Sequence, residues 1–191
     1  MRFILFIFLI FASQPCFSQT VDDGYKAYDA EEYEKAKAII IPLAEKNDPK
    51  AMNAMGVFYS EGKAFEKNRQ KACDWYEKAA NANYPAAQNN LAACFGLSGG
   101  RPTNGAQAYK WYLKAAEAGN KSSQNALMKH FIDRDRKKSI YWGKKAAAQG
   151  NAAAKVSLWM LNEHERPTAS EILCVFTKVY IFKQSTNACD D

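Results

Sequence analysis

Cysteine is the residue type in this 191-residue chain whose number and spacing point most directly to a chemical reaction. Beyond residue 18 the chain holds four of them, Cys73, Cys94, Cys174 and Cys189. An even count in an exported chain predicts disulfide bonds, and four cysteines allow three pairings. The alternative is that Cys94 is only a small apolar residue of the core.

Export is predicted from the first residues. Arg2 precedes an apolar run over residues 3–12, which is shorter than the roughly 20 residues needed to span a bilayer. Small residues, Cys16 and Ser18, lie three and one positions before Gln19. This layout is typical of a signal peptide cleaved after residue 18. A lipoprotein signal with Cys16 as the lipidated residue, or an uncleaved anchor, is the alternative.

The chain then divides into three parts. We predict a cleaved signal peptide over residues 1–18, a folded region over residues 19–183 and a C-terminal tail over residues 184–191, which a Cys189 disulfide would pin. The expected location is the periplasm, with secretion or the cell surface as alternatives. No stable membrane span is expected after cleavage.

Residues suited to catalysis or metal binding are sparse. The two histidines, His130 and His164, have no cysteine or paired carboxylate at metal-ligand spacing. The chain shows no serine-nucleophile motif, glycine-rich phosphate loop or zinc signature. We therefore expect no catalytic residues, no metal, no cofactor and no enzymatic activity.

The charge balance is mildly basic, with 26 lysines and arginines against 20 aspartates and glutamates. We interpret this excess as solvated helix faces, spread along the helices rather than gathered in one run. A nucleic acid is not expected as a partner outside the cytoplasm, whereas an acidic protein is compatible with the excess.

A repeated segment defines the elements that must position these residues. KACDWYEKAA at residues 71–80 recurs as QAYKWYLKAA at 107–116 and, more loosely, as KSIYWGKKAA at 138–147. Such a period is typical of an all-α solenoid, in which stacked helix pairs bury a shared core. Trp75, Trp111 and Trp142 head one column of the repeat, and we expect all three to be core residues rather than binding aromatics.

Helix boundaries follow from caps and breakers. Asn68 and Gly62 are expected to begin one helix and end another, and Gly56 to let two helices approach closely. Pro42 is expected to kink or shorten its helix. The expected ranges are 21–30, 32–46, 51–62, 85–96 and 152–164, with the tryptophan helices between them and a last helix opened by Pro167.

The repeat register favours one pairing of the cysteines. Cys73 lies in the second helix of one repeat and Cys94 in the first helix of the next, almost equally far from the turn between them. Such positions face each other in an antiparallel helix hairpin. We therefore predict a Cys73–Cys94 disulfide, which leaves Cys174 for Cys189.

The columns resemble the Sel1-like repeat, a relative of the tetratricopeptide repeat. AMNAMGVFYSEG at 51–62 with KACDWYEKAANANY at 71–84 matches its pattern closely, and residues 85–96 with 107–120 match nearly as well. The third and fourth repeats are degenerate, and the resemblance covers about residues 22–182. It implies a right-handed α-solenoid of antiparallel helix pairs, with first helices lining a concave surface that holds another protein.

The resemblance also suggests a biological role. Some exported relatives are immunity proteins made beside a secreted toxin, and we predict that this chain neutralises an antibacterial toxin effector by binding it. The alternatives are a general envelope or cell-surface adaptor and, from a cysteine-rich branch of the family, a cell-wall or β-lactam-binding enzyme.

The resemblance also indicates which positions of each first helix face a bound partner, and the residues at those positions can be read from this sequence. Two residues before the leucine column the chain has three asparagines 36 residues apart, which we expect to form a line on the concave face. Amides both donate and accept hydrogen bonds, so they suit a bound peptide or loop. The alternative is that they are solvated or bonded to the adjacent helix. The full predicted partner-binding set is Asn53, Asn89, Asn125, Lys129, Asp133, Trp159 and Glu163.

Overall fold

The computed structural model describes residues 19–96, 99–162 and 167–177. Within these ranges the chain forms helices and no strand. The helices are α1 (Val21–Asp29), α2 (Tyr33–Glu45), α3 (Pro49–Glu61), α4 (Arg69–Asn81), α5 (Pro85–Cys94), α6 (Gly105–Glu117), α7 (Lys121–Phe131), α8 (Arg136–Ala148), α9 (Ala152–Met160) and α10 (Ala169–Cys174). The predicted signal peptide and C-terminal tail lie outside the described residues.

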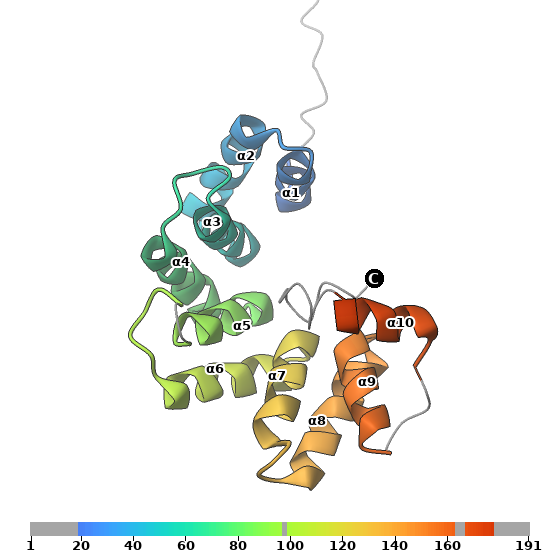
Figure 1. Ribbon diagram of the computed structural model, residues 1–191. Helices are drawn as coiled ribbons and strands as arrows, with labels where there is room; N and C mark the ends of the chain where they lie inside the picture. The colour runs from blue at the N-terminus through green and yellow to red at the C-terminus, as the bar shows by residue number, and fades with distance from the viewer. Residues whose placement is uncertain (1–18, 97–98, 163–166, 178–191) are drawn as a thin grey trace, which may run out of the picture.

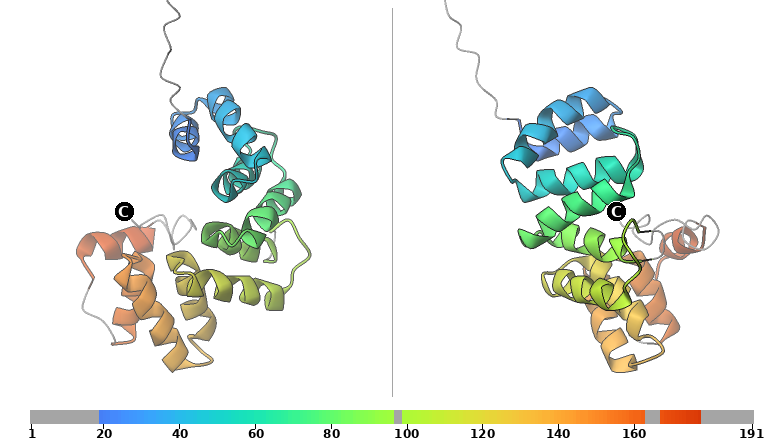
Figure 2. Two further views of the ribbon diagram at one scale, coloured as in Figure 1. Left: turned by 180° about the vertical axis from the view of Figure 1, so that it is seen from behind. Right: turned by 90° about the vertical axis from the view of Figure 1, so that its left-hand side faces the viewer.

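The helices stack as successive antiparallel pairs. Each helix packs on the next in chain order, and α1 also contacts α3, as α7 contacts α9. The stack bends into an open arc, in which α1, α3, α5 and α7 lie toward the hollow side and α2, α4, α6 and α8 toward the outside (Figures 1 and 2). The predicted all-α repeat solenoid is confirmed.

Asparagine and aspartate side chains begin most of these helices. Each accepts a hydrogen bond from the backbone N–H three residues later, which satisfies a donor that the helix itself leaves free. The capping residues are Asp48, Asn68, Asn104, Asn120, Asp135 and Asn151. Gly62 ends α3 with a φ of 78°, a conformation that favours glycine. The predicted caps at Asn68 and Gly62 are confirmed.

Pro42 does not end its helix early, contrary to one of the expected outcomes. Helix α2 continues to Glu45 with Pro42 inside it. Proline removes the hydrogen bond to the carbonyl four residues earlier, here that of Ala38. Both Pro42 and Ala38 are exposed, so water can hydrate the carbonyl that loses its partner.

Small residues allow the helix pairs to approach closely. Gly56 of α3 is buried, and a Cβ atom built on it would lie 2.4 Å from a ring carbon of Tyr76 on α4. Ala79 and Ala80 are fully buried beside this contact. Among the described residues the apolar core has one large cluster over α1–α5, a second over α6–α9 and a small third one where α9 meets the last helix.

The tryptophan column is less buried than its repetition suggests. Trp142 is buried at 7% exposure, whereas Trp75 and Trp111 are half-buried at the edge of the core. The ammonium group of Lys78 lies 4.2 Å from the centre of the Trp75 ring. Lys114 covers Trp111 in the same way at 5.4 Å. The prediction that all three are core residues is therefore right for Trp142 and wrong in part for the other two.

Candidate protein-binding surface

A chain of hydrogen bonds crosses the inner helices of the arc. The Asn53 amide donates to the hydroxyl of Tyr25, 3.3 Å away, and accepts from the Asn90 amide at 3.0 Å. Asn89 donates to Asn90 at 3.3 Å and accepts from the Ser123 hydroxyl at 2.9 Å. These bonds link α1, α3, α5 and α7, so the polar side chains hold successive repeats in register.

The three predicted asparagines do not form an exposed line. Asn53 is 5% exposed and Asn125 is 1% exposed, while Asn89 is half-buried. The amides of Asn53 and Asn89 are used in bonds between neighbouring helices, which is the alternative weighed for them. A partner on the inner side therefore does not reach the amides of Asn53 and Asn125.

Asn90 takes part in this network and was not among the predicted residues. It lies one position after the expected column, and one residue turns a helix by 100°. The sequence shows the Asn89-Asn90 pair, but the repeat pattern alone does not say which of the two amides bonds to the preceding repeat.

Exposed charges lie farther along the inner helices. Lys129 near the end of α7 and Asp133 in the following turn are exposed, and Ile132 between them is 40% exposed. Loss of hydration lowers the pKa of the Lys129 ammonium below its usual value, although the side chain remains accessible. Trp159 is half-buried on α9, and Glu163 lies outside the described residues.

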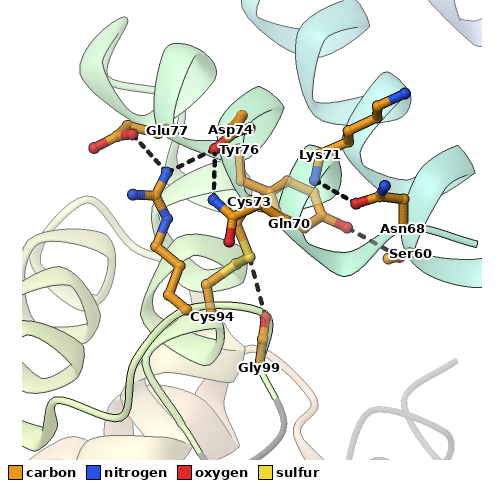
Figure 3. Close-up of a disulfide and its surroundings, with 11 residues drawn as sticks. Ser60, Asn68, Gln70, Lys71, Cys73, Asp74, Tyr76, Glu77, Cys94 and Gly99 are labelled. Atoms are coloured by element: carbon orange, nitrogen blue, oxygen red, sulfur yellow. Dashed lines mark hydrogen bonds and ion pairs between the residues drawn. A yellow bond between two sulfur atoms is a disulfide. The ribbon is translucent and has the colours of Figure 1, made fainter.

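A pocket of about 280 Å³ opens beside these helices, against the disulfide. Polar atoms reach it from α3, α4 and α5, where Tyr76 donates a hydrogen bond of 3.3 Å to Ser60 (Figure 3). The pocket is also lined by Arg69 and the small residues Ala72, Ala93 and Gly99. Its mixed lining suits one large side chain of a partner.

The disulfide joins Cys73 of α4 to Cys94 of α5, with their Cα atoms 6.0 Å apart, as the repeat register predicts. The Sγ atom of Cys73 also contacts the carbonyl oxygen of Gly99 at 3.1 Å (Figure 3). A disulfide sulfur carries no hydrogen, so this is a packing contact rather than a hydrogen bond. Cys174 is also disulfide-bonded, and its predicted partner Cys189 lies outside the described residues.

The loop between α5 and α6 folds back over this disulfide. The guanidinium of Arg101 bonds to Asp74 at 3.0 Å and to Glu77 at 2.7 Å, both on α4. Glycine is required at two positions. A Cβ atom on Gly99 would lie 2.4 Å from backbone oxygens of α5, and Gly100 has a φ of 96°. The loop therefore forms one wall of the pocket.

Within the described ranges, no cluster of three histidine, cysteine, aspartate or glutamate side chains could hold a metal ion. None of the helices in these ranges combines the length and the apolar character that crossing a membrane requires.

Comparison with known proteins identifies the repeat. The Sel1 repeat family model matches residues 49–84, 85–120 and 129–151. No curated protein matches the chain in sequence. A Sel1 repeat protein from Oxalobacter formigenes is similar in structure, with a TM-score of 0.69 and 28% identity, over 75% of this chain and 59% of that one.

A second similar structure is a protective antigen of uropathogenic Escherichia coli with an SLR fold. It has a TM-score of 0.67 and 26% identity, over 80% of this chain and 36% of its own length. The chain thus spans well under two thirds of both structures. Sel1 repeats commonly mediate protein–protein interactions and are typically non-catalytic scaffolds. By its repeats and its structural neighbours, the chain is a Sel1-like repeat protein.

Proposed function

We propose that this chain is an exported protein-binding solenoid, and that it acts as an immunity protein that neutralises a toxin effector in the periplasm by binding it. The observation that carries the proposal is the inner surface of the arc. There, a hydrogen-bonded network from Tyr25 to Ser123 holds four helices in register beneath exposed groups. A preorganised surface loses little conformational entropy on binding.

The distribution of exposed groups favours a protein over a small molecule. Small, apolar and charged side chains succeed one another along the inner helices at Ala93, Ile132, Lys129 and Asp133. A small-molecule site instead buries most of its ligand in one cavity of roughly 300–1,000 Å³. The pocket beside the disulfide, at about 280 Å³, is smaller than those beside α10 and between α1 and α2, at about 570 and 380 Å³. Its own size fits a single side chain of a larger partner.

The periplasmic location rests on two features. The first is the predicted signal peptide over residues 1–18. The second is the Cys73–Cys94 disulfide, because such bonds persist in oxidising compartments and are rare in the cytosol. N-terminal sequencing of the protein from a periplasmic extract should begin at Gln19. A protein that still begins at Met1 would contradict cleavage.

Co-expression tests the neutralising role. Each exported protein encoded beside this chain is produced in the periplasm of a sensitive host, with and without this chain. A toxin partner should stop growth alone, and co-expression should restore it. The variants Lys129→Glu and Asp133→Lys should reduce the rescue at least tenfold in viable counts, because both residues are exposed at the end of α7, one of the inner helices, or just after it. Lys110→Glu, an exposed change on α6, is the matched control and should rescue fully.

Two other outcomes separate the parts of the proposal. If no neighbouring protein is toxic but an envelope protein binds the purified chain and loses binding in Lys129→Glu, the role is that of an adaptor. If binding is unaffected by Lys129→Glu and Asp133→Lys, the inner surface is not the binding site. Saturable binding or turnover of cell-wall fragments or a β-lactam would contradict a protein-binding role.

A further inference from the structure

The positive charge of the chain is concentrated in one repeat. Residues 121–151, which include α7 and α8, hold eight lysines and arginines and two aspartates, in a chain with 26 basic and 20 acidic residues. The remainder of the chain is therefore close to neutral. The expectation of an excess spread along the helices is wrong, and the charge requires its own explanation.

Helix α8 carries much of this charge on one exposed face. Lys137, Tyr141 and Lys145 are each four residues apart, so they lie on the same side of the helix over about 12 Å. All three are exposed, and Tyr141 is 51% exposed. The Lys145 ammonium lies 4.7 Å from the centre of the Tyr141 ring. We refer to these three residues as the α8 basic face.

Few carboxylates balance this face. In the described part of the chain, Lys137 and Lys145 form no ion pair. Asp135 pairs with Lys138 at 3.3 Å and is already engaged in capping α8. On α4, the equivalent second helix of an earlier repeat, Asp74 and Glu77 surround a cation instead. In the repeat register Tyr141 takes the place of Asp74, and Lys137 takes that of Gln70, so the α8 face lacks the carboxylate that α4 carries there.

Two of the α8 lysines occupy an unfavourable part of the helix. Lys137 and Lys138 lie in the first turn of α8, which contains no acidic residue. The N-terminal end of a helix carries a partial positive charge, so cations there are destabilising. Lys137 therefore gains nothing from the helix dipole. Lys138, in contrast, is paired with Asp135, and Lys145 lies in the last turn, where a cation is favourable.

We propose that the α8 basic face binds an acidic segment of a protein partner. The spacing of Lys137 and Lys145 predicts that the partner segment carries two carboxylates about 12 Å apart. Between them we expect an apolar or aromatic side chain that packs on Tyr141. A line of charges around one aromatic ring suits a peptide segment better than a lipid surface, which requires a wider basic field and inserted apolar groups. Helix α8 lies on the outer side of the arc, so this surface is distinct from the inner one (Figure 1).

A designed peptide tests the proposal with the purified mature protein. The probe is a fluorescent helical peptide with two glutamates eight residues apart and a phenylalanine midway between them. Its binding is followed by fluorescence anisotropy at low and physiological salt. We expect saturable binding that weakens with salt, and little binding of the peptide in which glutamine replaces glutamate.

Protein variants locate the contact. Lys137→Glu with Lys145→Glu should weaken binding at least tenfold, and Tyr141→Ala should weaken it severalfold. The matched control is Lys46→Glu with Lys67→Glu, a pair of exposed lysines in the N-terminal half that form no ion pair within the described residues. The control should bind as the parent protein does. Circular dichroism should show the same helical content in all variants.

Three outcomes would overturn the proposal. The first is no saturable binding of the glutamate peptide, and the second is equal binding by the Lys137→Glu, Lys145→Glu variant. The third is that vesicles with 30% anionic phospholipid, or a single-stranded oligonucleotide, bind through these residues more tightly than the peptide does. The Lys129→Glu variant changes the inner surface and leaves the α8 basic face intact. A negative result for peptide binding to α8 can therefore be distinguished from a negative result for partner binding to the inner surface.

Discussion

Loss of the Cys73–Cys94 disulfide should lower the stability of the chain by a magnitude that the structure lets us calculate. The bridge closes a segment with a sequence separation of 21 residues. In the chain-entropy treatment, a loop of this length corresponds to about 3 kcal/mol at 25 °C, because the bridge restricts the unfolded chain. Alanine is the best replacement, since Cys73 and Cys94 are both buried, at 1% and 3% exposure.

Urea unfolding followed by circular dichroism measures the loss. With a urea dependence of about 2 kcal/mol per molar, the Cys73→Ala, Cys94→Ala variant should unfold at a midpoint about 1.5 M lower than the parent. Reduction of the parent should move its midpoint toward that of the variant. Cys174→Ala is the necessary control, because Cys174 is also disulfide-bonded and the reductant acts on both bridges.

Two results would refute this reasoning. In the first, peptide mapping shows the Cys73–Cys94 bridge in the parent, while the variant unfolds at the same urea midpoint. In that case the bridge does not stabilise the fold by restricting the unfolded chain. If the exported protein has free thiols at both positions, the bridge itself is absent. Faster hydrogen exchange in the loop around Gly99 and Arg101 should accompany the loss, since that loop packs on the disulfide and on α4.

Further tests concern packing and ionisation. Gly56→Ala should destabilise the chain by about 1–3 kcal/mol in urea unfolding, because its Cβ would meet the ring of Tyr76, whereas Gly105→Ala, with no atom within 4 Å, should be neutral or stabilising. Burial raises the pKa of Tyr25 to about 12 and also raises that of Tyr28, whose hydroxyl donates to Glu61. Their contribution to stability should be complete below pH 10 and lost as the pH rises toward 12 and beyond. Absorbance at 295 nm and circular dichroism should therefore show these tyrosines ionising together with unfolding, and their ionisation at pH 10 in the folded protein would contradict the burial.

The scaffold was predictable because its signals are local and repeated. A capping residue such as Asn68 needs only the backbone N–H three residues later, so its role follows from its position before an apolar pattern. The facing cysteines are likewise defined by the antiparallel geometry of two adjacent helices. The effect of Pro42 was missed because it depends on which side of the helix faces water, and Pro42 lies on the exposed side.

The candidate site was predictable only in part. Column positions place Asn53, Asn89 and Asn125 on first helices, but exposure depends on how far adjacent repeats rotate relative to one another. In the structure Asn53 and Asn125 are buried, and Asn90 bonds to Asn53 of the preceding repeat. Repetition of Trp75 indicates packing, yet it does not reveal that a lysine from the same helix covers part of the ring.

The repeated and the unrepeated residues have different physical roles. A residue that recurs from repeat to repeat occupies a similar place in the stack, and its hydrogen bonds or apolar contacts are used in stacking, as those of Asn53 are. Recognition of a particular partner requires groups that the stack does not use and that differ between repeats. Lys129 and Asp133 around the end of α7, and Tyr141 on α8, meet both conditions, because they are exposed and the other repeats have different residues in their places. The degenerate third repeat, of which the family model matches only residues 129–151, is for this reason the part of the chain where substitutions should separate binding from stability.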